Sequence, residues 1–167
     1  MRQDERQTLK QRFQFRCGYC GVSEGDAGAE LTVDHFQPRS QGGLHEPENW
    51  VYCCHACNEF KGDSWQPNSP RRILHPLRDD LASHMVEQED GTLHALTETG
   101  AFHIERLHLN RRQLVAYRCE RRLLAAARQT QARLFERLQQ LEEQVQTLSA
   151  QLEQFDRGDP NTSISSS

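Results

Sequence analysis

Two short stretches decide the fold of this chain: RCGYCG at residues 16–21 and CHACNEFKGD at residues 54–63. Each contains a Cys-x-x-Cys pair. A tight turn places both sulfurs of a pair on one side of a metal ion, and two such turns complete a tetrahedral site. We therefore predict a structural zinc site, because four thiolates leave no open position. The predicted ligands are Cys17, Cys20, Cys54 and Cys57.

The composition is that of a polar chain of 167 residues, with 35% hydrophobic and 26% charged residues. A large aliphatic core is not expected, so the metal site should stabilise part of the fold. The stretch MRQDERQTLKQRF has no apolar segment typical of a secretory signal, and no stretch resembles a membrane span. We expect a cytoplasmic protein, in which paired cysteines more often bind metal than form disulfides, with a redox dithiol as the alternative.

The segment between the cysteine pairs carries the candidate catalytic residues. It reads LTVDHFQPRSQGG from residue 31 to residue 43, and its first three residues are a short strand signal. The strand is expected to end with Asp34 and His35. Because these residues are adjacent, their side chains should point to opposite faces of the strand. One of them can bind a metal ion while the other faces an attacking water. Asn58 and Lys61 follow the second cysteine pair at helical spacing and share one face of a helix.

These residue types suit the hydrolysis of a phosphodiester bond. The reaction needs a base that activates water and a cation that stabilises charge on the phosphate. A neutral imidazole accepts a proton close to neutral pH, so His35 is the candidate base. Asp34 and Asn58 offer hard oxygen ligands for Mg²⁺ or Mn²⁺, and Lys61 is a candidate phosphate contact.

Taken in order, RCGYCG, LTVDHFQPRSQGG, ENW and CHACNEFKGD resemble the HNH endonuclease family in its zinc-knuckle variant, over residues 14–63. The resemblance implies a ββα-metal hairpin and helix, with His35 as general base and Asp34 and Asn58 as ligands of the catalytic cation. It also implies that Asn49 fixes the loop that carries the histidine and that the four cysteines bind zinc. Many members have histidine where Asn58 stands, but asparagine still offers an oxygen ligand.

Each candidate also has a simpler explanation when taken singly. Asp34 can cap a turn and Asn58 can cap a helix, because Asp and Asn commonly do so. Together, inside a zinc framework, they favour a metal-dependent endonuclease acting on DNA, in restriction, phage defence or a mobile element. The alternative is a non-catalytic, zinc-stabilised subunit that binds nucleic acid or protein.

The rest of the chain is expected to form an extension and a long helix, which gives an α+β fold class. Asp90-Gly91 should turn a β-hairpin, a short helix is expected at residues 101–109, and Asn110 is a plausible N-cap of the long helix. The expected parts are a zinc-stabilised nuclease domain at residues 1–62, a connector with a β-hairpin and helix at 63–110, a long helix at 111–156 and a disordered tail at 157–167.

Apolar residues follow a heptad pattern along the second half of the predicted long helix, which contains neither Gly nor Pro. They alternate steps of four and three, which is typical of a coiled-coil seam. We therefore expect the helix to form a homodimer or to dock on a protein partner. The seam consists of Leu134, Leu138, Leu141, Val145, Leu148, Leu152 and Phe155.

Charge is distributed unevenly. The whole chain has a formal net charge of −4, which is unusual for a protein that binds nucleic acid. However, Arg111–Arg137 holds eight arginines against two glutamates, a net charge of +6. A local basic stripe can therefore serve DNA binding. The candidate contacts are Arg39, Arg111, Arg118 and Arg122.

Overall fold

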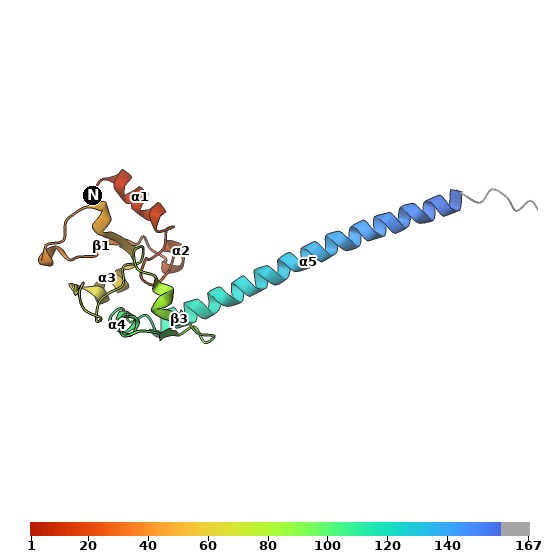
Figure 1. Ribbon diagram of the computed structural model, residues 1–167. Coiled ribbons are helices and arrows are strands. Elements are labelled where there is room, and N and C mark those ends of the chain that lie inside the picture. Colours follow the sequence, from red (N-terminus) through yellow and green to blue (C-terminus); the bar gives the residue numbers. More distant parts are fainter. Residues whose placement is uncertain (158–167) are drawn as a thin grey trace, which may run out of the picture. The chain divides into compact units, whose positions relative to one another are not determined.

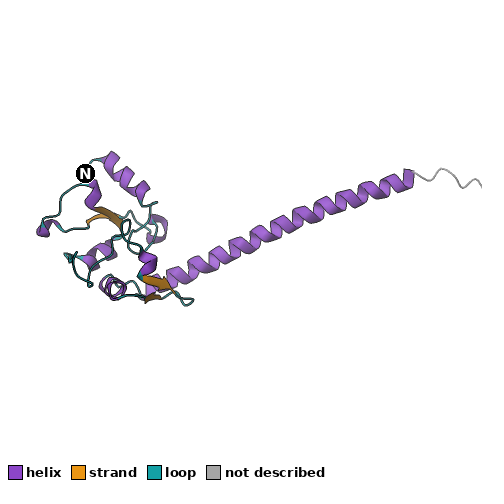
Figure 2. Ribbon diagram, viewed as in Figure 1, coloured by secondary structure: helices purple, strands orange, loops and turns teal. Residues whose placement is uncertain are grey.

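The computed structural model describes the backbone of residues 1–157 and the side chains of residues 1–154. Helices and short strands are mixed along the chain (Figure 1), and Figure 2 shows how short the strands are. The predicted α+β class is confirmed. The helices are α1 (Gln3–Arg12), α2 (Glu24–Ala27), α3 (His55–Lys61), α4 (Glu98–Arg106) and α5 (Arg112–Arg157). The strands are β1 (Thr32–His35), β2 (Trp50–Cys53), β3 (Met85–Glu87) and β4 (Leu93–Ala95). Single-turn 3₁₀ helices lie at Arg39–Gln41, Pro47–Asn49 and Leu81–Ser83.

The chain divides into two compact units, Met1–Glu120 and the chain from Arg121 on. The first unit contains both sheets and the first four helices. The second consists, in its described part, of the remainder of α5. The tail predicted at residues 157–167 lies, from residue 158 on, outside the described residues.

The first sheet is the antiparallel pair β1–β2, in which Asp34 lies opposite Val51 and His35 opposite Trp50. All four residues of β2, the run WVYC, are buried, as expected for a short apolar strand that is covered on both faces. Helix α1 packs on β2 and α3 packs on β1. Leu9 of α1 and Phe13, which follows α1, enter the same core. The β1–β2 hairpin and α3 hold the candidate functional residues.

The second sheet is the β-hairpin of β3 and β4, which was predicted from its turn. Gly91 has a φ of +80°, which favours glycine, and the Asp90 carboxylate accepts a hydrogen bond from the Thr92 amide at 2.9 Å. Next to this hairpin, α4 begins after Thr97, whose hydroxyl caps the Gly100 amide at 3.1 Å. The helix expected at residues 101–109 therefore starts earlier and ends at Arg106.

The predicted N-cap role of Asn110 is wrong. Its amide side chain instead forms two hydrogen bonds with the backbone of Leu93, at 2.7 and 2.8 Å, and so joins β4 to the turn before the long helix. Helix α5 begins at Arg112 and is one uninterrupted helix in Figure 1. No helix among residues 1–157 combines the length and the apolar character needed to cross a membrane.

Candidate active site and metal centre

One open depression in the first unit gathers most of the candidate catalytic residues. It lies where the end of β1 meets α3, because these two elements pack on one another. Asp34 and His35 reach it from β1 and Asn58 from α3. The lining residues are Val33, Asp34, His35, Pro38, Arg39, Ser40, Asn58, Gly62 and Asp63.

Asp34 lies at the floor of this depression and is only 6% exposed. The hydroxyl of Tyr19 donates to its carboxylate at 2.6 Å, and the ammonium of Lys61 lies 3.0 and 3.1 Å from its two oxygens. Burial raises the pKa of Asp34 above its ordinary value, although Lys61 and Tyr19 oppose that rise. The carboxylate is thus held in place by Tyr19 and Lys61.

The structure contradicts a phosphate contact by Lys61. Its side chain is completely buried, and its ammonium donates to Asp34 and to the backbone carbonyl of His35, at 3.0 Å. A buried ammonium must be paired, and Lys61 is paired with Asp34. Lys61 is therefore placed to position Asp34 and the end of β1 rather than to meet a substrate.

Replacing Lys61 with methionine should lower the free energy of unfolding by about 3–5 kcal/mol, because Asp34 would remain buried without its cation. Urea denaturation monitored by circular dichroism measures this loss. The matched control is Lys10→Met, which removes a lysine with surface ion pairs to Glu24 and Glu30 and should cost far less. Equal losses in the two variants would contradict the role assigned to Lys61.

His35 stands beside Asp34 on β1 but is only partly buried. Its Nε2 is 2.8 Å from Nδ1 of His45, and the two rings lie 5.1 Å apart between centroids. Partial burial, together with the nearby charges of His45, Arg39 and Lys61, lowers the pKa of His35 below its ordinary value. The imidazole is therefore neutral near physiological pH, which is the form that can accept a proton.

The loop after β1 is held closed by Asn49. The side-chain oxygen of Asn49 accepts from the Gln37 amide at 2.8 Å, and its nitrogen donates to the carbonyls of Gln37 and Leu44 at 3.0 and 2.9 Å. Gly43 packs so closely on this loop that a Cβ there would collide with the Gln37 carbonyl. These contacts fix the backbone that follows His35.

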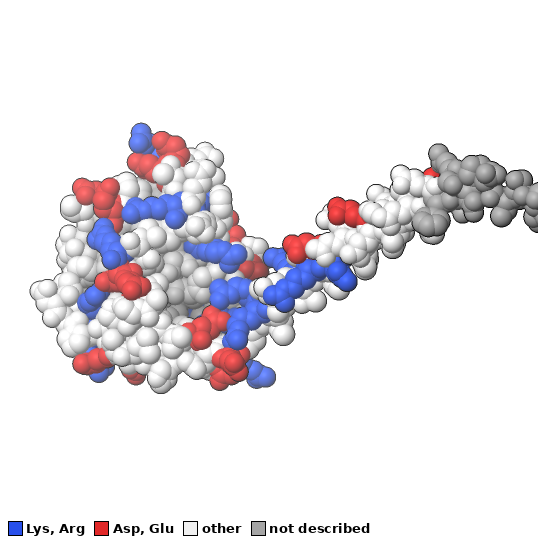
Figure 3. Space-filling model, turned by 45° about the vertical axis from the view of Figure 1, so that its right-hand side comes forward, with Lys and Arg blue, Asp and Glu red and all other residues white. Residues whose placement is uncertain are grey.

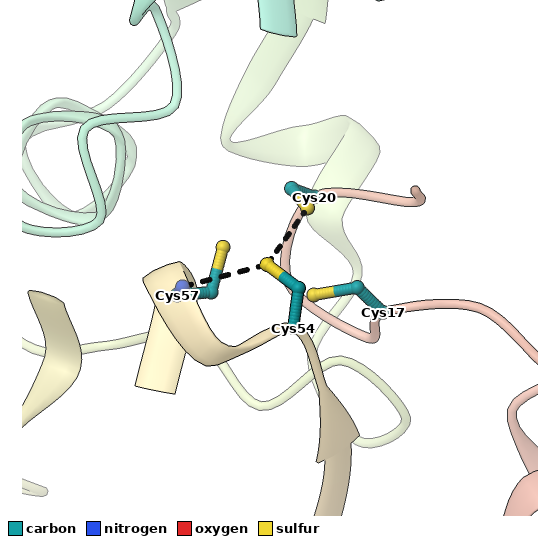
Figure 4. Close-up of side chains that lie close together, drawn as sticks. All are labelled: Cys17, Cys20, Cys54 and Cys57. Atoms are coloured by element: carbon teal, nitrogen blue, oxygen red, sulfur yellow. Dashed lines mark hydrogen bonds between the residues drawn. The ribbon is translucent and has the colours of Figure 1, made fainter. Parts of the chain in front are cut away.

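The four cysteines of the two Cys-x-x-Cys pairs come together in one cluster (Figure 4), with all their sulfurs within 4.8 Å of one another. The sulfurs of Cys20 and Cys54 are 3.8 Å apart. A tetrahedral zinc ion with Zn–S bonds of about 2.3 Å requires sulfurs about 3.8 Å apart, so this donor set fits zinc. Hydrogen bonds within the cluster lower the pKa of the Cys54 thiol and raise that of the Cys57 thiol, because the four sulfurs interact closely.

Two of the arginines proposed as nucleic-acid contacts face the protein interior instead. Arg111 donates to the sulfurs of Cys54 and Cys57 at 3.9 and 3.7 Å, where a cation stabilises thiolates. Arg118 is 4% exposed, and its guanidinium donates to the backbone carbonyls of Gly91 and Leu109. Arg118 is therefore inaccessible to DNA, and the partly exposed Arg111 contacts the cysteine cluster.

The other two proposed arginines are at least partly accessible. Arg39 is exposed and lines the depression beside His35. Arg122 is exposed on the part of α5 that belongs to the second unit. Of the four arginines proposed from the sequence, Arg39 is the one in the depression.

Three residues of the site were missed by the sequence reasoning: Tyr19, His45 and Asp63. Tyr19 lies inside the first cysteine pair, where no role was predicted for it, yet its hydroxyl donates to Asp34. Asp63 closes the motif CHACNEFKGD and lines the depression. His45 follows the Gly42-Gly43 turn at no regular spacing from His35, so no sequence signal identified it.

Comparison with known proteins agrees with this geometry. Residues 17–64 match the family model described as HNH endonuclease. This segment is an HNH domain. In addition, 91 residues of the chain (54%) are 34% identical to the CRISPR-associated endonuclease Cas9 of Corynebacterium diphtheriae. The chain spans only 8% of the length of that relative. No solved structure matches the chain. The predicted family is thereby confirmed, and both comparisons support a nuclease-type function.

Proposed function

We propose that this chain is a metal-dependent endonuclease that hydrolyses phosphodiester bonds in DNA. The observation that carries the proposal is that Asp34, His35 and Asn58 line the same open depression in a domain of the HNH family. A binding module would not need a neutral imidazole beside two oxygen donors. The depression is open enough to admit a polynucleotide backbone, with Arg39 at its side.

In this proposal His35 is the general base. The contact of its Nε2 with His45 fixes the ring, so Nδ1 is the nitrogen that would accept the proton of the attacking water. The lowered pKa keeps His35 in its basic form at neutral pH. Asn49 and Lys61 act indirectly, because they hold the backbone at His35 and directly after it.

Asp34 and Asn58 would hold the catalytic Mg²⁺ or Mn²⁺. They fit such a cation because both offer hard oxygen donors in the depression, and Asp34 is kept in place by Tyr19 and Lys61. When bound, the cation would stabilise the charge that develops on the phosphate and the leaving oxygen. Arg39 would contact a neighbouring phosphate.

Substitution of the two proposed ligands should weaken metal activation more than DNA binding. Asp34→Asn and Asn58→Ala should each raise the Mn²⁺ concentration for half-maximal cleavage by about 10- to 100-fold, because the loss of even indirect support of a metal site has effects of that size. Rates are measured in a Mn²⁺ titration, and DNA affinity is measured separately without divalent ions.

The matched control is Tyr19→Phe, which removes a hydrogen bond to Asp34 but no proposed ligand. It should shift the Mn²⁺ requirement less than either ligand variant does. If Asp34→Asn and Asn58→Ala lose DNA affinity as much as metal activation, they are not metal ligands.

A second candidate function is a non-catalytic, zinc-stabilised subunit that docks through its C-terminal helix. The observation in its favour is the row of exposed leucines on α5, which suits a helical partner. The two functions are separated by whether the chain cleaves DNA by itself. Because the Cas9 relative is far longer than this chain, only the HNH chemistry is inferred for this chain from that relative. We further propose that the chain acts in restriction, phage defence or a mobile element.

A further inference from the structure

The described part of the second unit presents an apolar stripe that nothing in that unit covers. Its heptad positions, including three upstream of the predicted seam, are occupied as follows: Leu124, Ala127, Gln131, Leu134, Leu138, Leu141, Val145 and Leu148. The exposed fraction of the leucines and the valine in this set lies between 41% (Leu141) and 61% (Val145). A helix with such a stripe requires a partner surface of the same shape.

The charges of α5 are divided along its length. Between residues 121 and 137, five arginines stand against one glutamate, whereas residues 138–154 contain three glutamates and no basic residue. Figure 3 shows basic side chains along the first part of the long helix and acidic ones further along. Two parallel helices would place arginines beside arginines, at a cost in electrostatic energy. Two antiparallel helices would place each basic half beside an acidic half.

We infer that α5 pairs with α5 of a second copy of this chain in an antiparallel coiled coil centred on the level of Glu136. In this register each of the eight heptad residues from Leu124 to Leu148 meets another of this set in the second copy. The layers are Leu134 with Leu138, Gln131 with Leu141, Ala127 with Val145 and Leu124 with Leu148, each occurring twice. The small Ala127 opposite the larger Val145 allows close packing.

The flanks of the seam select this register. Arg128 follows the seam residue 127, and Glu142 follows the seam residue 141, so both occupy the same heptad position. In this register, Arg128 of one copy lies near Glu142 of the second copy. The register also brings Phe135, which is 60% exposed, near its own counterpart. If the helices were shifted so that only residues 134–152 overlapped, Glu142 would face Glu142. In a parallel pair, Arg128 would flank Leu123, without a partner of opposite charge.

Charge reversal tests the pairing and the register together. Sedimentation of the full wild-type chain at tens of micromolar should give a dimer. Arg128→Glu and Glu142→Arg should each raise the dissociation constant by about tenfold, because two attractive contacts become repulsive. The double variant should restore the wild-type constant within about threefold. The matched control, Arg133→Glu, makes the same charge change outside the seam and its flanks, and should have little effect.

Three results would overturn the inference. A wild-type chain that is monomeric at these concentrations would contradict the self-association, even if the chain bound a different protein. A dimer that is insensitive to Arg128→Glu would be parallel or in another register. A double variant as weak as the single variants would show that Arg128 and Glu142 do not meet. Leu138→Glu, with Gln139→Glu as its solvent-facing control, should dissociate the dimer whichever register it adopts.

Discussion

Replacement of His35 with alanine should lower the rate of DNA cleavage by about 10²- to 10⁴-fold, the usual effect of removing a positioned general base. The side chain contributes no core packing that would make the loss structural, since it is only partly buried at the edge of the depression. Single-turnover rates at saturating Mn²⁺ measure the effect. Zinc content and the circular dichroism spectrum should remain those of the wild-type chain.

His45→Ala is the matched control, because it removes a neighbouring imidazole that orients His35 but does not take the proton. The loss of one orienting hydrogen bond should lower the rate by about three- to tenfold. If His35→Ala retained wild-type turnover, or lost no more than His45→Ala, the assignment of His35 as the base would be wrong.

Removal of the zinc ion should unfold the nuclease domain. Zinc binding by thiolates contributes about 10–16 kcal/mol in small modules, which exceeds the roughly 5–15 kcal/mol that stabilises a typical domain. The cluster also lies in the hydrophobic core, where Cys17 and Cys57 are buried. Cys57→Ser should therefore lose the one zinc ion per chain together with the cooperative unfolding transition. Elemental analysis and thermal denaturation measure the two losses.

Cys53→Ala is the control for this prediction. Cys53 is equally buried but lies outside the cluster of four sulfurs, and burial raises the pKa of its thiol. The variant should keep its zinc and unfold cooperatively. A Cys57→Ser chain that is folded, active and free of zinc would refute the structural role of the metal.

The features predicted best from the sequence are those fixed by short-range geometry. Cys-x-x-Cys spacing alone brings two sulfurs together, and adjacent strand residues differ in environment, as the buried Asp34 and the partly exposed His35 do. The hairpin at Asp90-Gly91 follows from the backbone conformation that glycine permits. Such constraints act within a few residues and do not depend on the tertiary fold.

The incorrect predictions concern side chains whose environment depends on distant segments. Lys61 and Arg118 are charged and were predicted to contact phosphate or DNA. Instead, both donate to backbone carbonyls, and Lys61 also pairs with the Asp34 carboxylate. Arg111 approaches sulfurs more than 50 residues earlier in the sequence. Sequence patterns record charge but not burial, so a buried cation resembles one that binds DNA.

The long helix α5 and the residue Asn110 before it show the same division. The absence of Gly and Pro predicted a continuous helix, and α5 is continuous over its described length. Asn110 has the side chain of an N-cap, but a hydrogen-bonding partner at Leu93 competes for it. Local propensity was overridden there by a tertiary contact.

The central claim is that the HNH domain cleaves DNA with a divalent metal ion and His35. Its most direct test is the incubation of supercoiled plasmid with the zinc-loaded full chain, in the presence of Mg²⁺ or Mn²⁺ and without added divalent metal. Nicked or linear DNA is expected in the presence of the metal and none without it, and His35→Ala should form product at least about 100-fold more slowly. Intact plasmid after prolonged incubation with the folded wild-type chain and metal, or equal cleavage by His35→Ala, would contradict it.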